Sequence, residues 1–129
     1  MMSPSRESIA SSARGRRGER LAQKFLEGKG FTFIERNFKT PRWGEIDLVM
    51  RDGGTTVFVE VKTRSSSSAQ LFGGPLGSIN YHKMKALKRA GQFYLSSKGY
   101  DREAVRIDAV SVVLNEQGDA RIEHFANIP

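Results

Sequence analysis

The sequence contains no cysteine, which excludes a disulfide framework and every thiolate metal site. It has no apolar run long enough to span a bilayer, and its beginning lacks the apolar region of a secretion signal. Its two histidines have no metal-ligand spacing, and it has neither a glycine-rich phosphate-binding motif nor a nucleophile elbow. We therefore expect a cytoplasmic protein with no membrane partner, whose chemistry depends on other residues.

Acidic residues are scarce over most of the chain. Residues 1–102 hold nineteen lysines and arginines but only nine acids, and the formal net charge of all 129 residues is +7. Basic clusters of this kind favour a polyanion, because binding to phosphates releases counterions. A membrane surface fits less well, since no strongly amphipathic helix accompanies the charge. We therefore expect nucleic acid as the partner and favour DNA over RNA.

The length suits one domain with a single core. Residues 1–13 are rich in serine and have little to bury, which predicts a disordered tail before a single domain at 14–129. Residues 65–78 contain serines, glycines and a proline without periodicity and predict a long loop. That loop is either a lid ordered by substrate or a flexible connection.

Apolar residues at helical spacing predict two helices, over about residues 14–28 and 80–97. Glycines at their ends act as stop signals. The second helix carries basic residues and no acid, which favours neutralisation by phosphate. On the first helix, Glu19 lies at the edge of the apolar stripe, where it either points toward a sheet or pairs with a nearby arginine.

Alternating or continuous apolar patterns predict five strands, over residues 31–39, 45–50, 56–63, 105–114 and 120–125. The second and third form an antiparallel hairpin. The fourth follows a long helix, so a right-handed crossover would place it parallel to its neighbour. The order indicates an α/β fold with a central mixed sheet flanked by helices.

The hairpin is the most informative stretch. A turn at residues 53–54 would place Asp47 opposite Glu60, and Glu45 opposite Lys62. Like charges whose Cβ atoms are about 5 Å apart destabilise a hairpin. A divalent cation such as Mg²⁺, held by Asp47 and Glu60, would offset the repulsion. The alternatives are a protonated carboxylate, or a slipped register in which both acids are solvated.

Two further expectations concern the start of the hairpin. Alternation predicts that Asp47 shares a face of its strand with Glu45 and Val49. Trp43 precedes the acids directly and could stack on a base. A single aromatic residue beside a strand is more often part of the core or its rim, and we favour that interpretation.

An aspartate on one strand, Glu60-x-Lys62 on the next and an acid on the preceding helix resemble the PD-(D/E)XK nuclease superfamily, which has a restriction-endonuclease-like αβββαβ core. Within it, five segments resemble the YraN family of small bacterial proteins: Gly15-x-x-Gly18-Glu19, Gly44–Leu48, Phe58–Arg64, Lys83 and Arg106-x-Asp108-x-Val110. The resemblance covers about residues 14–125. The combination of GEIDL with FVEVKTR is its most specific part.

The resemblance implies metal-dependent nuclease chemistry with Mg²⁺ or Mn²⁺. It implies four metal ligands: Asp47, Glu60, the Val61 carbonyl and Glu19, the last as in proteins similar to archaeal Holliday-junction resolvases. Lys62 would complete the catalytic set by orienting the attacking water and stabilising developing charge. No role is implied for Glu45, which would simply pair with Lys62. One departure from the superfamily pattern is Ile46, because a proline often precedes the aspartate.

The expected function is a metal-dependent endonuclease that hydrolyses phosphodiesters in nucleic acid, with branched DNA as one candidate substrate. Seven basic residues would neutralise backbone phosphates: Arg16, Arg17, Arg20, Arg64, Lys83, Lys88 and Arg89. By analogy with dimeric resolvases, a homodimer is expected. The alternative is a nucleic-acid-binding protein that keeps the scaffold but does not cut. That alternative explains the basic helices but not the facing acids.

Overall fold

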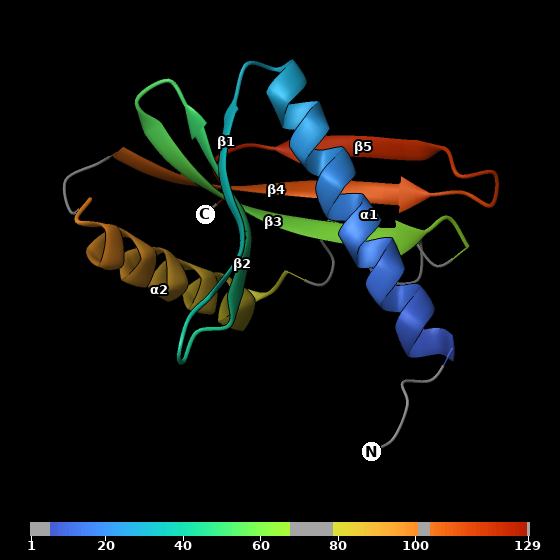
Figure 1. The fold of residues 1–129 in the computed structure, drawn as a ribbon, viewed down its shortest axis with the longest axis horizontal. Helices are drawn as coiled ribbons and strands as arrows, with labels where there is room; N and C mark the ends of the chain where they lie inside the picture. Colours follow the sequence, from blue (N-terminus) through green and yellow to red (C-terminus); the bar gives the residue numbers. More distant parts are fainter. Residues whose placement is uncertain (1–5, 68–78, 101–103, 129) are drawn as a thin grey trace.

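The computed structural model describes residues 6–67, 79–100 and 104–128. Its elements, in chain order, are α1 (Arg6–Gly28), β1 (Thr32–Lys39), β2 (Glu45–Asp52), β3 (Thr55–Ser65), α2 (Tyr81–Lys98), β4 (Ala104–Leu114) and β5 (Ala120–Phe125). The strands form one sheet in the order β1-β2-β3-β4-β5 (Figure 1). β3 and β4 are parallel, whereas the other neighbours are antiparallel. The predicted α/β fold, a mixed sheet flanked by helices with a restriction-endonuclease-like αβββαβ core, is confirmed.

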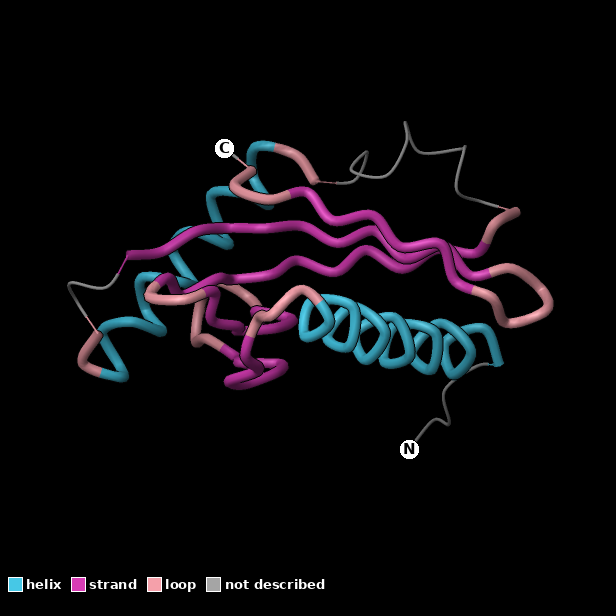
Figure 2. The backbone as a smooth tube through the Cα atoms, turned by 90° about the horizontal axis from the view of Figure 1, so that it is seen from above, coloured by secondary structure: helices cyan, strands magenta, loops and turns pink. Residues whose placement is uncertain are grey.

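The sheet separates two apolar cores, one under each helix. Successive side chains of a strand point to opposite faces, so Val59 of β3 joins the core beneath α1 while its neighbour Phe58 joins the core beneath α2. Leu26 of α1 and Tyr94 of α2 are almost fully buried in these cores. Figure 2 shows α1 lying along one side of the strands. The hydrophobic pattern of the hairpin thus anchors both helices.

Two glycines allow the helices to approach β3 closely. A Cβ atom added at Gly18 of α1 would lie 1.8 Å from Oγ1 of Thr63, and one at Gly91 of α2 would lie 2.7 Å from the ring of Phe58. A larger residue at either position would therefore push its helix away from the sheet. Because Gly18 immediately precedes Glu19, the close contact brings that acid next to the sheet.

α2 begins and ends within one residue of the predicted bounds. The Asn80 side chain accepts a hydrogen bond of 2.9 Å from the Lys83 N–H and so caps the first turn. Gly99, with a φ of 74°, ends the helix in the left-handed conformation that glycine adopts without steric hindrance. Within the described part of the chain, no helix has the length and apolar character needed to cross a membrane.

α1 begins at Arg6, about two turns before the predicted start near Arg14. The prediction of a disordered tail is therefore corrected for residues 6–13. These residues include no glycine or proline, and extending an existing helix orders only one residue for each added hydrogen bond. Residues 1–5 of the predicted tail and residues 68–78 of the predicted loop or lid lie outside the described residues.

Candidate metal centre

The turn end of the β2–β3 hairpin has the predicted register. Leu48 faces Val59 and Asp52 faces Thr55, as a turn at residues 53–54 requires. In the described chain, the ladder between these strands ends at the Leu48 pair. The prediction that the ladder continues through both acidic pairs is therefore wrong.

Asp47, the next residue beyond the ladder, contacts β3 through its side chain. The Val61 N–H donates a hydrogen bond of 2.8 Å to Asp47 Oδ2. Burial, and then the negative charge of Glu60, raise the pKa of Asp47 to about 8. Asp47 and Glu60 are thus electrostatic neighbours, as the sequence indicated, although they do not form a ladder pair.

The side chains of β2 change faces at Asp47. Leu48 belongs to the core beneath α1, whereas Ile46 belongs to the core beneath α2, although residues two apart in a regular strand share a face. The neighbouring strand is distorted at the same level. Asn37 of β1 lies between the residues that pair with Leu48 and Ile46, and its φ is 51°. The regular alternation of both strands therefore ends where the acidic residues begin.

This change of face corrects the predicted grouping of side chains. Val49 packs in the core beneath α2, whereas the Glu45 carboxylate shares the Asn37 amide with Glu19 of α1. Glu45 and Val49 therefore lie on opposite faces of β2. The predicted Glu45 pair with Lys62 is not found among the described residues, because the β2–β3 ladder ends before Glu45 and the Glu45 carboxylate accepts from Asn37 of β1.

Three carboxylates from two elements converge at this level. Glu19 comes from α1, and Glu45 and Asp47 come from β2. One ligand oxygen of each lies within 4.8 Å of the others, and all three side chains are half-buried. Carboxylate oxygens are the ligands that hard divalent cations prefer. These three residues could hold a metal ion.

Sequence reasoning identified Glu19 and Asp47 as ligands but not Glu45. A continuous β2–β3 ladder would place Glu45 opposite Lys62 and leave it without a role in metal binding. The missed signal was the pattern Glu45-x-Asp47, in which two acids stand two residues apart at the end of a strand.

Glu60 of β3 is the most buried acid of the site, with 4% of its surface exposed. One carboxylate oxygen, Oε1, lies 3.2 Å from Nζ of Lys83 on α2. The other, Oε2, is buried and has no hydrogen-bond partner within the described residues. A buried carboxylate oxygen without a partner is destabilising by roughly 1–3 kcal/mol or more. This oxygen therefore fits a cation that binds the same site.

Two lysines act on Glu60. Burial raises the pKa of Glu60, and the charge and hydrogen bond of Lys83, followed by the charge of Lys62, oppose that rise. Lys83 was predicted as a phosphate contact, but the structure pairs it with Glu60 while leaving 46% of its side chain exposed. Lys62 is half-buried on β3, two residues beyond Glu60. Its predicted catalytic role stays a prediction.

The other predicted phosphate contacts lie mainly on the two helices. Arg16, Arg17 and Arg20 are exposed on α1, and Lys88 and Arg89 are exposed on α2. The Arg17 guanidinium donates a hydrogen bond to the Gly118 carbonyl. The other helical arginines and lysines keep the exposed positions that phosphate binding requires.

Arg64 does not have the exposed position predicted for it, whereas Trp43 lies where it was expected. Arg64 is 7% exposed, because it lies inside the sheet on β3 and faces Val113 of β4. This burial does not suit the predicted phosphate contact. Trp43 is half-buried against the core beneath α2, and the guanidinium of Arg89 lies 4.8 Å from its ring centre. The interpretation of Trp43 as a core or rim residue is confirmed.

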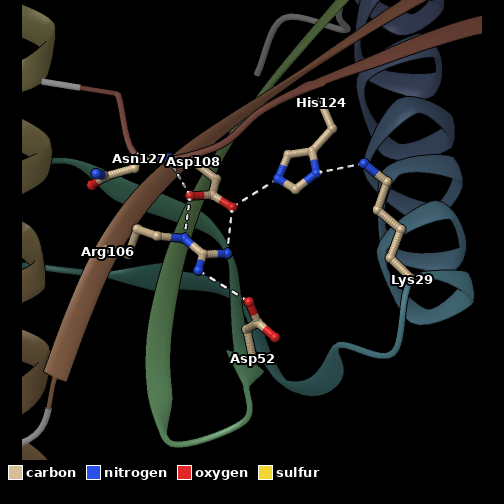
Figure 3. A network of polar contacts seen from close by, with 6 residues as sticks. All are labelled: Lys29, Asp52, Arg106, Asp108, His124 and Asn127. Atoms are coloured by element: carbon tan, nitrogen blue, oxygen red, sulfur yellow. Dashed lines mark hydrogen bonds and ion pairs between the residues drawn. The ribbon is translucent and has the colours of Figure 1, made fainter.

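A second polar cluster surrounds the fully buried Asp108 of β4 (Figure 3). Its carboxylate accepts hydrogen bonds from Arg106 at 2.9 and 3.1 Å, from His124 Nε2 at 2.7 Å and from the Asn127 N–H at 2.9 Å. Burial acts to raise the pKa of Asp108, but these hydrogen bonds outweigh burial and lower it. Every oxygen of this carboxylate is therefore satisfied by protein groups.

The cluster reaches three other parts of the fold. Arg106 also donates to Asp52 at the β2–β3 turn, at 3.0 Å, and Lys29 near the end of α1 lies 2.9 Å from His124 Nδ1. The Arg106-x-Asp108 motif thus joins β4 to β5, to the hairpin turn and to α1. In contrast to Glu60, Asp108 offers no orphaned oxygen, and we assign this cluster a structural role.

Comparisons with known proteins agree with these motifs. A family model described as "Uncharacterised protein family UPF0102" matches residues 18–112. A UPF0102 protein of Beutenbergia cavernae is 43% identical over 119 residues, which cover 92% of this chain and 98% of the relative. One of Solibacter usitatus is 44% identical over 110 residues (84% and 80%), and one of Thermodesulfovibrio yellowstonii is 40% identical over 115 residues (88% and 92%). The protein belongs to the UPF0102 family, as the resemblance to the YraN family indicated.

Proposed function

We propose that this protein is a metal-dependent phosphodiester hydrolase that acts on nucleic acid. The observation that carries the proposal is the convergence of Glu19, Glu45 and Asp47 beside a buried Glu60 whose Oε2 has no hydrogen-bond partner among the described residues. Four acids, opposed by Lys83 and, at Glu60, also by Lys62, form a site that a divalent cation would stabilise. A purely structural role leaves this excess of acid unexplained.

The donor set fits Mg²⁺ or Mn²⁺. Asp47 and Glu60 would hold the ion, with Glu19 and Glu45 as further direct or water-mediated ligands, because all four offer hard oxygen atoms. When bound, the ion would polarise the scissile phosphate and activate a water molecule as nucleophile. Burial and Glu60 raise the pKa of Asp47, and a cation at the site would lower it again, because metal binding requires the ionised carboxylate.

The protein groups around the site would then position the reactants. The Val61 N–H fixes one oxygen of Asp47, which leaves the other oxygen for a ligand. Lys83 holds Oε1 of Glu60 and favours its charged form. Lys62, half-buried on the same strand, would hold the attacking water or stabilise the negative charge that develops on the phosphate.

The exposed cations of α1 and α2 would bind the sugar–phosphate backbone. Such contacts carry little sequence information and weaken steeply as salt rises. The substrate is therefore recognised mainly by charge and shape. We favour DNA over RNA, and a homodimer acting on branched DNA follows only from the resemblance to junction resolvases.

A cleavage panel tests the proposal. End-labelled linear, flapped, four-way-junction and single-stranded DNA, with matching RNA, would be incubated with Mg²⁺, Mn²⁺ or EDTA. We expect metal-dependent cleavage of at least one substrate, lost in Asp47→Ala and Lys62→Ala and kept in the control Gln117→Ala, which changes an exposed uncharged residue between β4 and β5. Absence of cleavage across the panel, with nucleic-acid binding intact, would instead support the binding protein that does not cut.

A further inference from the structure

We propose that Asn37 is a positioning residue of the candidate metal centre. Its side chain holds two of the carboxylates, Glu19 and Glu45, close together. This inference rests on the proposed function. The Asn37 Nδ2 donates hydrogen bonds to Glu19 Oε1 at 3.2 Å and to Glu45 Oε1 at 2.6 Å. One side-chain amide thus links an acid of α1 to an acid of β2.

The chemistry of the amide suits this task. An NH₂ group has two hydrogens, so it can donate to both carboxylates at once, whereas the opposite orientation would direct the amide oxygen at two acids. Asn37 contacts one oxygen of each carboxylate and leaves the second for a cation. A lysine at this position would also bind both acids, but its charge would compete with a metal ion. A neutral donor holds the ligands without neutralising them.

The backbone conformation of Asn37 also supports this positioning role. Its φ of 51° lies in the left-handed region, which few residues other than glycine adopt and which asparagine tolerates best among them. This conformation occurs at the level of Asp47, where β1 and β2 lose their regular alternation. Without that change of face, Glu45 would point toward α2 and away from Glu19. Backbone strain of this kind clusters at functional sites.

Glycine at position 37 separates the two contributions of this residue. Asn37→Gly keeps the left-handed backbone, which glycine adopts freely, and removes the amide donor. Asn127→Gly is a matched control, because Asn127 has a φ of 53° and lies in the Asp108 cluster instead. Both substitutions make the same chemical change at a left-handed position, and only one of them touches the candidate metal centre.

The measurement is calorimetric titration of Mn²⁺ into wild-type protein and both variants, with thermal unfolding of the metal-free proteins alongside. Substituting a group that orients metal ligands typically weakens metal binding by about 10- to 100-fold. We expect Asn37→Gly to weaken Mn²⁺ binding by at least about tenfold and Asn127→Gly to leave it unchanged. In a Glu45→Ala background the effect of Asn37→Gly should shrink, because one of its two partners is gone.

The outcomes separate this inference from the proposed function. Unchanged Mn²⁺ affinity in Asn37→Gly, or an equal effect in the Glu45→Ala background, would overturn the positioning role and leave the metal centre standing. Failure of wild-type protein to bind Mn²⁺ would overturn both. Weakened Mn²⁺ binding in Asn37→Gly, in a protein that cleaves no substrate, would support the positioning role while the hydrolase proposal fails.

Discussion

The raised pKa of Asp47 leads to a quantitative prediction about folding stability in the absence of metal. Burial and the neighbouring Glu60 raise its pKa from 3.8 to about 8. Between these pH values the folded protein keeps a proton that the unfolded chain has released, so the free energy of unfolding falls as pH rises. Asp47→Asn removes this effect and keeps an oxygen that can accept from the Val61 N–H. The variant should therefore become increasingly more stable than wild type as pH rises.

The size of the effect follows from proton linkage. One proton that differs between the two states changes the free energy of unfolding by at most about 1.4 kcal/mol per pH unit. The stability difference between Asp47→Asn and wild type should grow with a slope up to that value from about pH 5. It should level off above about pH 8, where folded Asp47 is also ionised.

The assay is denaturant unfolding of both proteins in EDTA at each pH unit from 5 to 9. Saturating Mn²⁺ provides the control, because a bound cation favours ionised Asp47 and should abolish the slope in wild type. A stability difference that stays constant with pH, or a wild type that gains stability relative to the variant as pH rises, would show that folded Asp47 does not keep a proton above pH 5.

Three further predictions concern other parts of the fold. Gly18→Ala would place a methyl group against Thr63. We expect the free energy of unfolding, measured with denaturant, to fall by about 1–3 kcal/mol, and Mn²⁺ binding to weaken because Glu19 is displaced. Unchanged stability would contradict the close packing. Asp108→Asn removes the charge at the centre of the buried cluster and should destabilise by roughly 3–5 kcal/mol; a change under about 1 kcal/mol in the same assay would refute its structural role. The logarithm of the DNA association constant, measured by fluorescence anisotropy, should fall linearly with the logarithm of salt concentration, and Arg20→Ala should reduce that slope by about one phosphate contact; an affinity that does not change with salt concentration would exclude backbone recognition.

The register of the hairpin could be predicted because its turn is short and glycine-rich. A turn at residues 53–54 leaves few alternatives, and the pairs from Leu48 to Asp52 follow from it. Parallel β4 was equally predictable, since a long helix precedes it. Both features depend on local patterns that a single sequence contains.

The arrangement of the acids could be predicted only in part. The Gly18-Glu19 pair and Asp47 were recognised from their motifs, but the position of Glu45 depends on the left-handed conformation of Asn37 on a neighbouring strand. The apolar pattern of residues 31–39 predicts a regular strand and gives no indication of that conformation. The burial of Arg64 likewise depends on the sheet around it.

We propose that the converging carboxylates are required for the cleavage of nucleic acid and not only for its binding. The most direct measurement compares binding and cleavage in the same two proteins, wild type and Asp47→Asn, using fluorescence anisotropy in Ca²⁺-free EDTA buffer and product formation after addition of Mn²⁺. We expect both proteins to bind DNA with equal affinity and only wild type to cleave it. Equal cleavage by both proteins, or binding without cleavage by either, would contradict the proposed hydrolase function.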